Sequence, residues 1–129
     1  MSDRKLKPTE AELEILQVLW QNGPSSVRQV NEILSEKRET GYTTTLKLMQ
    51  IMLEKNLVSR NTDSRTHIYN AAVKERETQR QLLDHFVDAA YRGSASRLVL
   101  QLLGNRSATR EELDEIKALI QQMEKDQGL

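Results

Sequence analysis

Three helix-start signals of the same kind constrain this chain. In each, a Ser or Thr is followed three residues later by Glu or Gln, and each side chain satisfies a backbone N–H at the start of a helix. The three pairs are Thr9 with Glu12, Ser26 with Gln29, and Thr109 with Glu112. Apolar residues at helical spacing follow each pair. The pattern therefore predicts a mainly α-helical chain.

A third helix is predicted over residues 42–56, which read YTTTLKLMQIMLEKN. If Met49 faces the core, steps of 100° per residue place Met52 and Leu53 beside it and leave a polar face pointing away. β-branched threonine is a mediocre helix former. We therefore interpret the threonines as the cap of the helix and as side chains that contact a partner. The outward face and its shoulders hold Thr43, Thr44, Lys47, Gln50, Ile51 and Glu54.

A small β-hairpin is predicted next. Residues 57–61 and 66–70 are rich in β-forming side chains, residues 61–65 carry turn chemistry, and Arg60 and Arg65 lie near the tip. Three helices followed by a two-stranded wing is the plan of a winged helix-turn-helix domain, whose third helix usually reads DNA. We therefore expect a mainly α fold with a small β-hairpin, made of a winged-helix DNA-binding domain (1–72) and a helical dimerisation domain (73–129).

Charge is distributed in a way that suits this plan. The 129 residues carry 19 Lys and Arg against 19 Asp and Glu, so the overall charge gives no argument for nucleic acid. Residues 40–72, however, carry four basic and two acidic residues, a net +2 on the predicted reading helix and wing, where phosphate contact is expected. The expected base contacts are Thr43, Thr44, Lys47, Gln50 and Ile51, and the expected phosphate contacts are Lys55, Arg60 and Arg65.

Other interpretations of these residues stay open. The polar helix face can be a solvated surface, and the two arginines can be solubility charges on an edge strand. The winged helix can also be a protein–protein interaction adaptor without sequence-specific DNA binding. Salt separates these alternatives, because DNA binding weakens steeply as the salt concentration rises.

The C-terminal part carries much apolar surface. The body of residues 94–103 is almost wholly apolar, and the last helix has a heptad-like seam of Leu and Ile. Helices this short are marginal alone. Their apolar faces pack either on the N-terminal domain or, as we expect, on a second copy, which suits a reader of two-fold half-sites. The expected dimer contacts are Phe86, Leu98, Leu102, Leu103, Ile116 and Ile120.

Several function classes are disfavoured. The chain has no Cys, which removes disulfides, cysteine nucleophiles and thiolate metal sites. His67 and His85 make a poor metal set, and no nucleophile-elbow motif is present. No apolar run approaches the ~20 residues that span a bilayer, and no signal-peptide h-region is visible. We expect a cytoplasmic protein that is not an enzyme and has no metal, cofactor or membrane contact.

Four stretches together resemble the penicillinase and methicillin-resistance repressors, the BlaI/MecI family. They are LKPTEAELEILQVLW (6–20), YTT with LEKNLV (42–58), SRTHIYNA (64–71) and GSASRLVLQLL (93–103). The resemblance implies a winged-helix domain, a helical dimerisation domain and a homodimer bound to a palindromic operator. It also implies release from DNA when a membrane-bound, β-lactam-sensing metalloprotease signals and the repressor is cut in its apolar helix.

The chain departs from the family's pattern at three points. Family members often carry Arg in the reading helix where this chain has Ile51, which either touches a thymine methyl or meets a different operator. Better-known members are cut at an Asn–Phe bond, and the matching positions here, the expected cleavage site, are Gln101 and Leu102. The related copper-responsive repressors carry a C-terminal cysteine motif, which this chain lacks.

Overall fold

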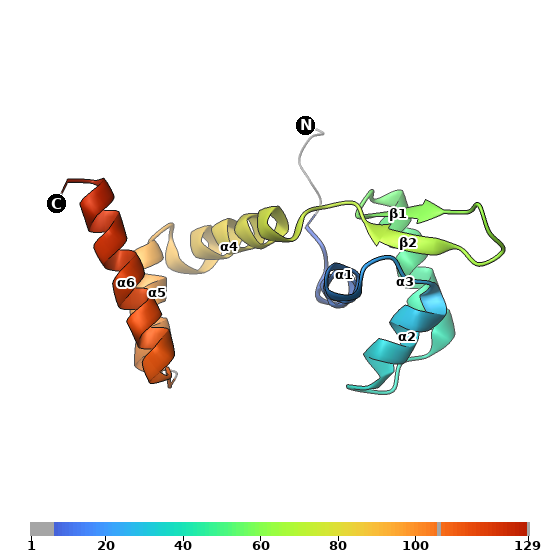
Figure 1. Cartoon of the computed structure of the whole chain (residues 1–129), viewed down its shortest axis with the longest axis horizontal. Helices are drawn as coiled ribbons and strands as arrows, with labels where there is room; N and C mark the ends of the chain where they lie inside the picture. Colours follow the sequence, from blue (N-terminus) through green and yellow to red (C-terminus); the bar gives the residue numbers. More distant parts are fainter. Residues whose placement is uncertain (1–6, 106, 129) are drawn as a thin grey trace. The chain divides into compact units, whose positions relative to one another are not determined.

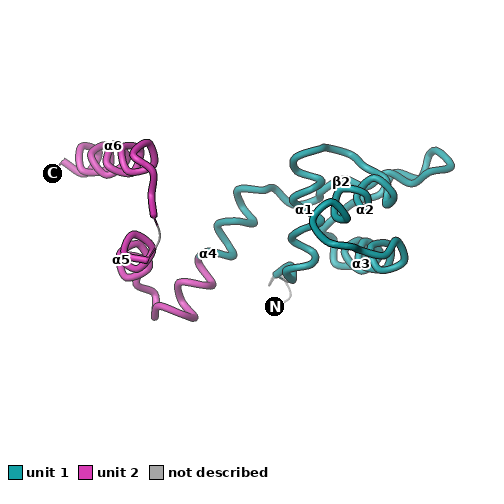
Figure 2. The backbone as a smooth tube through the Cα atoms, turned by 90° about the horizontal axis from the view of Figure 1, so that it is seen from below, with its two compact units in different colours: residues 1–83 teal, residues 84–129 magenta. Residues whose placement is uncertain are grey.

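Figure 1 shows the computed structural model of the chain, which describes residues 7–105 and 107–128. The chain divides into two compact units, Met1–Leu83 and Asp84–Leu129 (Figure 2). This division falls inside a long helix, and the domain boundary expected at 72/73 stays a prediction. None of the described helices is long and apolar enough to cross a membrane. Residues 1–6, part of the stretch searched for a signal peptide, lie outside the described residues.

The first unit is a winged-helix domain, as the order of elements predicts. Three helices, α1 (Glu10–Asn22), α2 (Val27–Ser35) and α3 (Tyr42–Glu54), precede an antiparallel hairpin of β1 (Val58–Asn61) and β2 (Ile68–Ala71). Each of the three helices contacts the other two, and the hairpin contacts α1 and α3 (Figure 1). The predicted fold class is therefore confirmed.

All three predicted capping boxes form, at the starts of α1, α2 and α6 (Arg110–Asp126). In the first, Thr9 Oγ1 accepts a hydrogen bond from Glu12 N at 3.2 Å, and Glu12 Oε1 accepts one from Thr9 N at 2.9 Å. The start of α3 differs, because Gly41 is its N-cap and no side chain caps it. The expectation that threonines cap this helix is wrong, since they lie inside its first turns.

The wing is tied to the helices through its second strand. β1 and β2 pair with Val58 opposite Ala71. On the other edge of β2, Tyr69 exchanges two backbone hydrogen bonds with Ser25 in the turn before α2, at 2.8 Å and 3.0 Å. Because the Tyr69 side chain is also buried, at 1% exposure, the hairpin and the start of α2 are held together.

The core of the first unit lies between the three helices and the hairpin. Burial of each large apolar side chain contributes roughly 1.5–3 kcal/mol, so this cluster fixes the rotation of α3 about its axis. The helix ends at Glu54, shortly before Asn56, whose φ of 63° lies in the left-handed region that Asn tolerates. The buried apolar side chains are Ile15, Leu16, Val18, Leu19, Val27, Val30, Met49, Met52, Leu57, Val58 and Tyr69.

The second unit holds the end of α4 (Glu75–Tyr91), α5 (Ala95–Asn105) and α6. The helix α5 runs past Gly104, which the sequence pattern predicts as part of its end. No described residue of α5 or α6 is buried. Among the described residues, the buried apolar cluster lies wholly in the first unit.

Candidate nucleic-acid interface

The helix α3 turns one face to the core and a polar face to solvent. Thr45, Met49 and Met52 fix the core face, and each is 0% exposed. Thr, Lys and Gln side chains can all pair with base edges in the major groove, and short side chains let a helix approach them closely. The predicted base contacts on the solvent face, all of them exposed, are Thr43, Thr44, Lys47 and Gln50. Their contact with bases stays a prediction.

Ile51 is less exposed than the polar residues of this face. The sequence pattern predicts that it points outward, but its side chain is half-buried. Lys55 lies one helical turn further along the same side of α3, and its ammonium reaches Glu12 at the start of α1. Ile51 is thus less exposed than the sequence pattern predicts, and its contact with a thymine methyl stays a prediction.

Lys55 is engaged inside the domain. Its Nζ lies 2.8 Å from Glu12 Oε2 and 3.1 Å from Oε1, and Glu12 is 2% exposed. Burial alone would raise the pKa of the Glu12 carboxyl, but the Lys55 ammonium and the Thr9 backbone N–H hold that pKa below its ordinary value. Moving Lys55 to a phosphate would leave a buried carboxylate without its partner, so we leave Lys55 out of the proposed contact set.

The wing carries two exposed arginines. Arg60 lies on β1 and Arg65 in the turn that leads to β2. The turn is shaped by Asn61, whose Oδ1 accepts a hydrogen bond from Asp63 N at 2.8 Å. Neither arginine takes part in the ion pairs found among the described residues. Both guanidinium groups are therefore free to meet phosphates.

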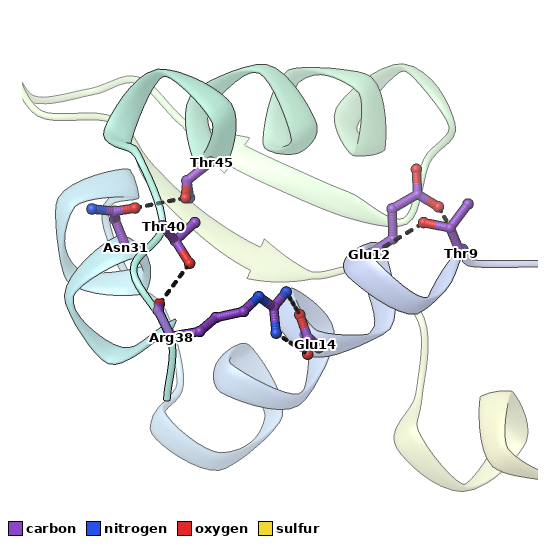
Figure 3. A network of polar contacts seen from close by, with 7 residues as sticks. All are labelled: Thr9, Glu12, Glu14, Asn31, Arg38, Thr40 and Thr45. Carbon is purple, nitrogen blue, oxygen red and sulfur yellow. Dashed lines mark hydrogen bonds and ion pairs between the residues drawn. The ribbon is translucent and has the colours of Figure 1, made fainter. Parts of the chain in front are cut away.

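An amide on α2 reaches the start of α3 (Figure 3). The Asn31 amide lies 2.7 Å from Thr45 Oγ1. The hydrogen-bond pattern orients its nitrogen to this side, where Thr40 O and Gly41 O lie at 3.0 and 3.3 Å. The contacts join α2 to the uncapped start of α3. A single Asn in an amphipathic helix carries no sequence signal, and we did not predict this role.

A surface ion pair holds the turn between α2 and α3 (Figure 3). Arg38 donates two hydrogen bonds to the Glu14 carboxylate of α1, at 2.8 and 3.0 Å. Arg38 lowers the pKa of Glu14, and Glu14 raises the pKa of Arg38. Because the side chains of Arg38 and Glu14 are 63% and 38% exposed, the pair adds little stability. Its two-pronged geometry instead fixes the direction of the turn.

The histidines show no metal-binding arrangement. His67 lies in the wing and His85 on α4, and both are exposed. Within residues 7–105 and 107–128, no group of three or more His, Asp or Glu side chains could hold a metal ion.

The predicted dimer contacts keep much of their surface uncovered in one copy. Leu98 and Ile116 are half-buried. The other four are more exposed: Phe86 50%, Leu102 44%, Leu103 42% and Ile120 50%. The expected cleavage bond, between Gln101 and Leu102, lies within α5, and the Tyr91 hydroxyl donates a hydrogen bond to Gln101 Oε1 at 3.1 Å.

Comparison with known proteins gives consistent matches. The model of a family described as penicillinase repressor matches residues 8–122. The chain is 20% identical to the methicillin resistance regulatory protein MecI of Mammaliicoccus sciuri over 120 residues. This aligned stretch covers 93% of this chain and 98% of MecI. It is 39% identical over 61 residues to the transcriptional regulator BlaI of Mycobacterium tuberculosis, 46% of this chain and 44% of BlaI. The transcriptional regulator Tm0710 from Thermotoga maritima has a similar fold, with a TM-score of 0.54 at 18% identity over 94% of this chain and 80% of its own.

Proposed function

This chain belongs to the penicillinase repressor family of winged-helix transcriptional regulators, which are not enzymes, and we propose that it represses transcription by binding a palindromic operator as a homodimer. The observation that carries the proposal is the polar face of α3, which the buried Thr45, Met49 and Met52 present to solvent in one orientation. A helix that carries Thr, Lys and Gln on such a face suits the major groove.

The proposal assigns separate roles to α3 and the wing. Thr43, Thr44, Lys47 and Gln50 contact base edges, and each well-placed pair contributes about 1–3 kcal/mol of discrimination against a wrong base. Arg60 and Arg65 contact phosphates, which position the domain but carry no sequence information.

The homodimer is supported by the state of the second unit. α5 and α6 have no buried residue among those described. Even their large apolar side chains are open to solvent, because Leu102, Leu103 and Ile120 are each at least 42% exposed. Short helices gain most of their stability when their apolar faces are packed against another surface. A second copy can cover these faces with its own α5 and α6. A two-fold dimer then presents two reading helices to two half-sites.

We also propose that repression is relieved when a signalling protease cuts the Gln101–Leu102 bond. Both side chains of that bond are exposed. The cut would separate Leu103, Ile116 and Ile120 from the DNA-binding unit. Each DNA-binding unit would then bind its half-site alone, without the higher affinity that comes from linking two units in a dimer. Mass spectrometry of the protein from cells treated with a β-lactam tests this. A fragment that ends at Gln101 supports the proposal, and operator release with the chain intact contradicts it.

Salt dependence tests the DNA proposal against the adaptor alternative. The affinity of the full chain for duplex DNA is measured by fluorescence anisotropy between about 50 and 200 mM salt. We expect the logarithm of the affinity to fall steeply and linearly with the logarithm of the salt concentration, because released counterions drive binding. A flat response would favour the adaptor.

A further inference from the structure

A hollow of about 640 Å³ lies beside α3, between the start of α2 and the wing. Arg28 of α2, Tyr42 of α3, and Arg65 and His67 of the wing line it. All four are exposed, and none of the residues that line the hollow is Asp or Glu. Three separate elements therefore bring basic and hydroxyl groups to one place.

Charge distinguishes this hollow from others in the same unit. In two of them, Arg38 lines the wall together with Glu14, and these two side chains neutralise each other at 2.8 Å. The ion pairs found among the described residues involve neither Arg28 nor Arg65. Two guanidinium groups that face one hollow without an acid form a place for an anion.

The position of the hollow indicates which anion it takes. Tyr42 precedes Thr43 in the first turn of α3, so the hollow adjoins the face that we propose reads bases. When a helix lies in the major groove, the phosphates of the groove edge pass beside it and are held by Arg, Tyr and other donors. A volume of several hundred Å³ is of the size that holds a small organic group rather than a lone ion, and thus suits a sugar-phosphate unit.

We propose that this hollow binds the sugar-phosphate backbone of the operator, with Arg28 and Arg65 as charged contacts and Tyr42 and His67 as hydrogen-bond donors. This proposal rests on the proposed function and adds α2 to a DNA-binding surface otherwise made of α3 and the wing. Because a phosphate contact reads no base, Arg28 contributes equally to every DNA sequence.

The test compares Arg28→Ala, His67→Ala and Tyr42→Phe in the full chain with Arg80→Ala, which removes an exposed arginine of α4. Affinity for a selected operator fragment and for a random duplex is measured over a range of salt concentrations. Arg28→Ala should weaken both complexes by the same factor, on the order of tenfold, and lower the salt slope by about one. Arg28→Lys should keep most of the affinity, because Lys also binds phosphate as a point charge.

The outcomes separate this proposal from the one on which it rests. If the unmodified chain binds DNA with a steep salt slope but Arg28→Ala, His67→Ala and Tyr42→Phe all match Arg80→Ala, the hollow is not a backbone site. If the unmodified chain shows no salt-dependent DNA binding, both proposals fail. Binding of inorganic phosphate that Arg28→Ala abolishes, with DNA affinity unchanged, would assign the hollow to a free anion and also overturn the backbone proposal.

Discussion

At the scale of single residues, buried polar contacts place α3 in the domain. The Asn31 amide reaches Thr45, which is 0% exposed, and the backbone of the turn before α3. α3 lacks the side-chain cap that α1 and α2 have. The contacts of Asn31 therefore tie the start of α3 to a neighbouring helix.

Replacing Asn31 tests that role. Asn31→Ala leaves the buried Thr45 hydroxyl without this partner, and we expect the free energy of unfolding to fall by about 1–3 kcal/mol. Urea unfolding followed by the fluorescence of Trp20, the only Trp in the chain, measures this for the first unit. Glu32→Ala, an exposed position on the same helix, is the matched control. Equal stability of the two variants would contradict the assigned role.

The Glu12–Lys55 pair predicts a dependence of stability on pH. The pKa of Glu12 is lower in the folded chain than its ordinary value of 4.5. Its stabilising contribution is thus complete above pH 4.5 and is lost as the pH falls through the folded-state pKa. We expect Glu12→Gln to be less stable than the unmodified chain at neutral pH and to lose less stability between neutral and acidic pH. Parallel losses of unfolding free energy on acidification would contradict this.

At the scale of elements, α3 is the part that we propose contacts the bases of DNA. Lys47→Ala should lower operator affinity more than affinity for a random duplex, by about 1–3 kcal/mol of discrimination. Lys37→Ala, which removes an exposed lysine just after α2, should leave that discrimination unchanged. Anisotropy titrations with both duplexes measure the ratio. An equal loss on both duplexes would make Lys47 a phosphate contact instead.

The elements were largely predictable from sequence, but their contacts were less so. Capping boxes are local signals, so the starts of α1, α2 and α6 follow from residues three apart. The rotation of α3 was predicted well enough to bury Met49 and Met52. Ile51 is half-buried rather than exposed, because a helical wheel gives the direction of a side chain but not the neighbours that cover it. Asn31 and the hollow at Arg28 depend on contacts between elements, which spacing along one helix does not encode.

At the scale of the whole molecule, the exposed apolar side chains of α5 and α6 indicate that a second copy of the chain covers them. We expect the unmodified chain to sediment as a dimer at tens of micromolar. Leu102→Glu combined with Ile120→Glu should shift it to a monomer, because buried unpaired carboxylates oppose association. Gln79→Glu combined with Gln81→Glu, at two exposed positions on α4, adds the same charge and should leave the dimer intact. A monomeric unmodified chain would contradict the assignment of α5 and α6.

In the proposed complex, two copies of the chain bind a palindromic operator through α3. Selection of bound fragments from a pool of random duplex DNA by the full chain tests it most directly. We expect enrichment of a two-fold symmetric sequence whose half-sites lie about one helical turn, or a multiple of it, apart. The combined Thr44→Ala and Lys47→Ala variant should lose that enrichment while the fold and the dimer survive. Recovery of no common sequence, or of one without two-fold symmetry, would contradict operator binding by a two-fold dimer.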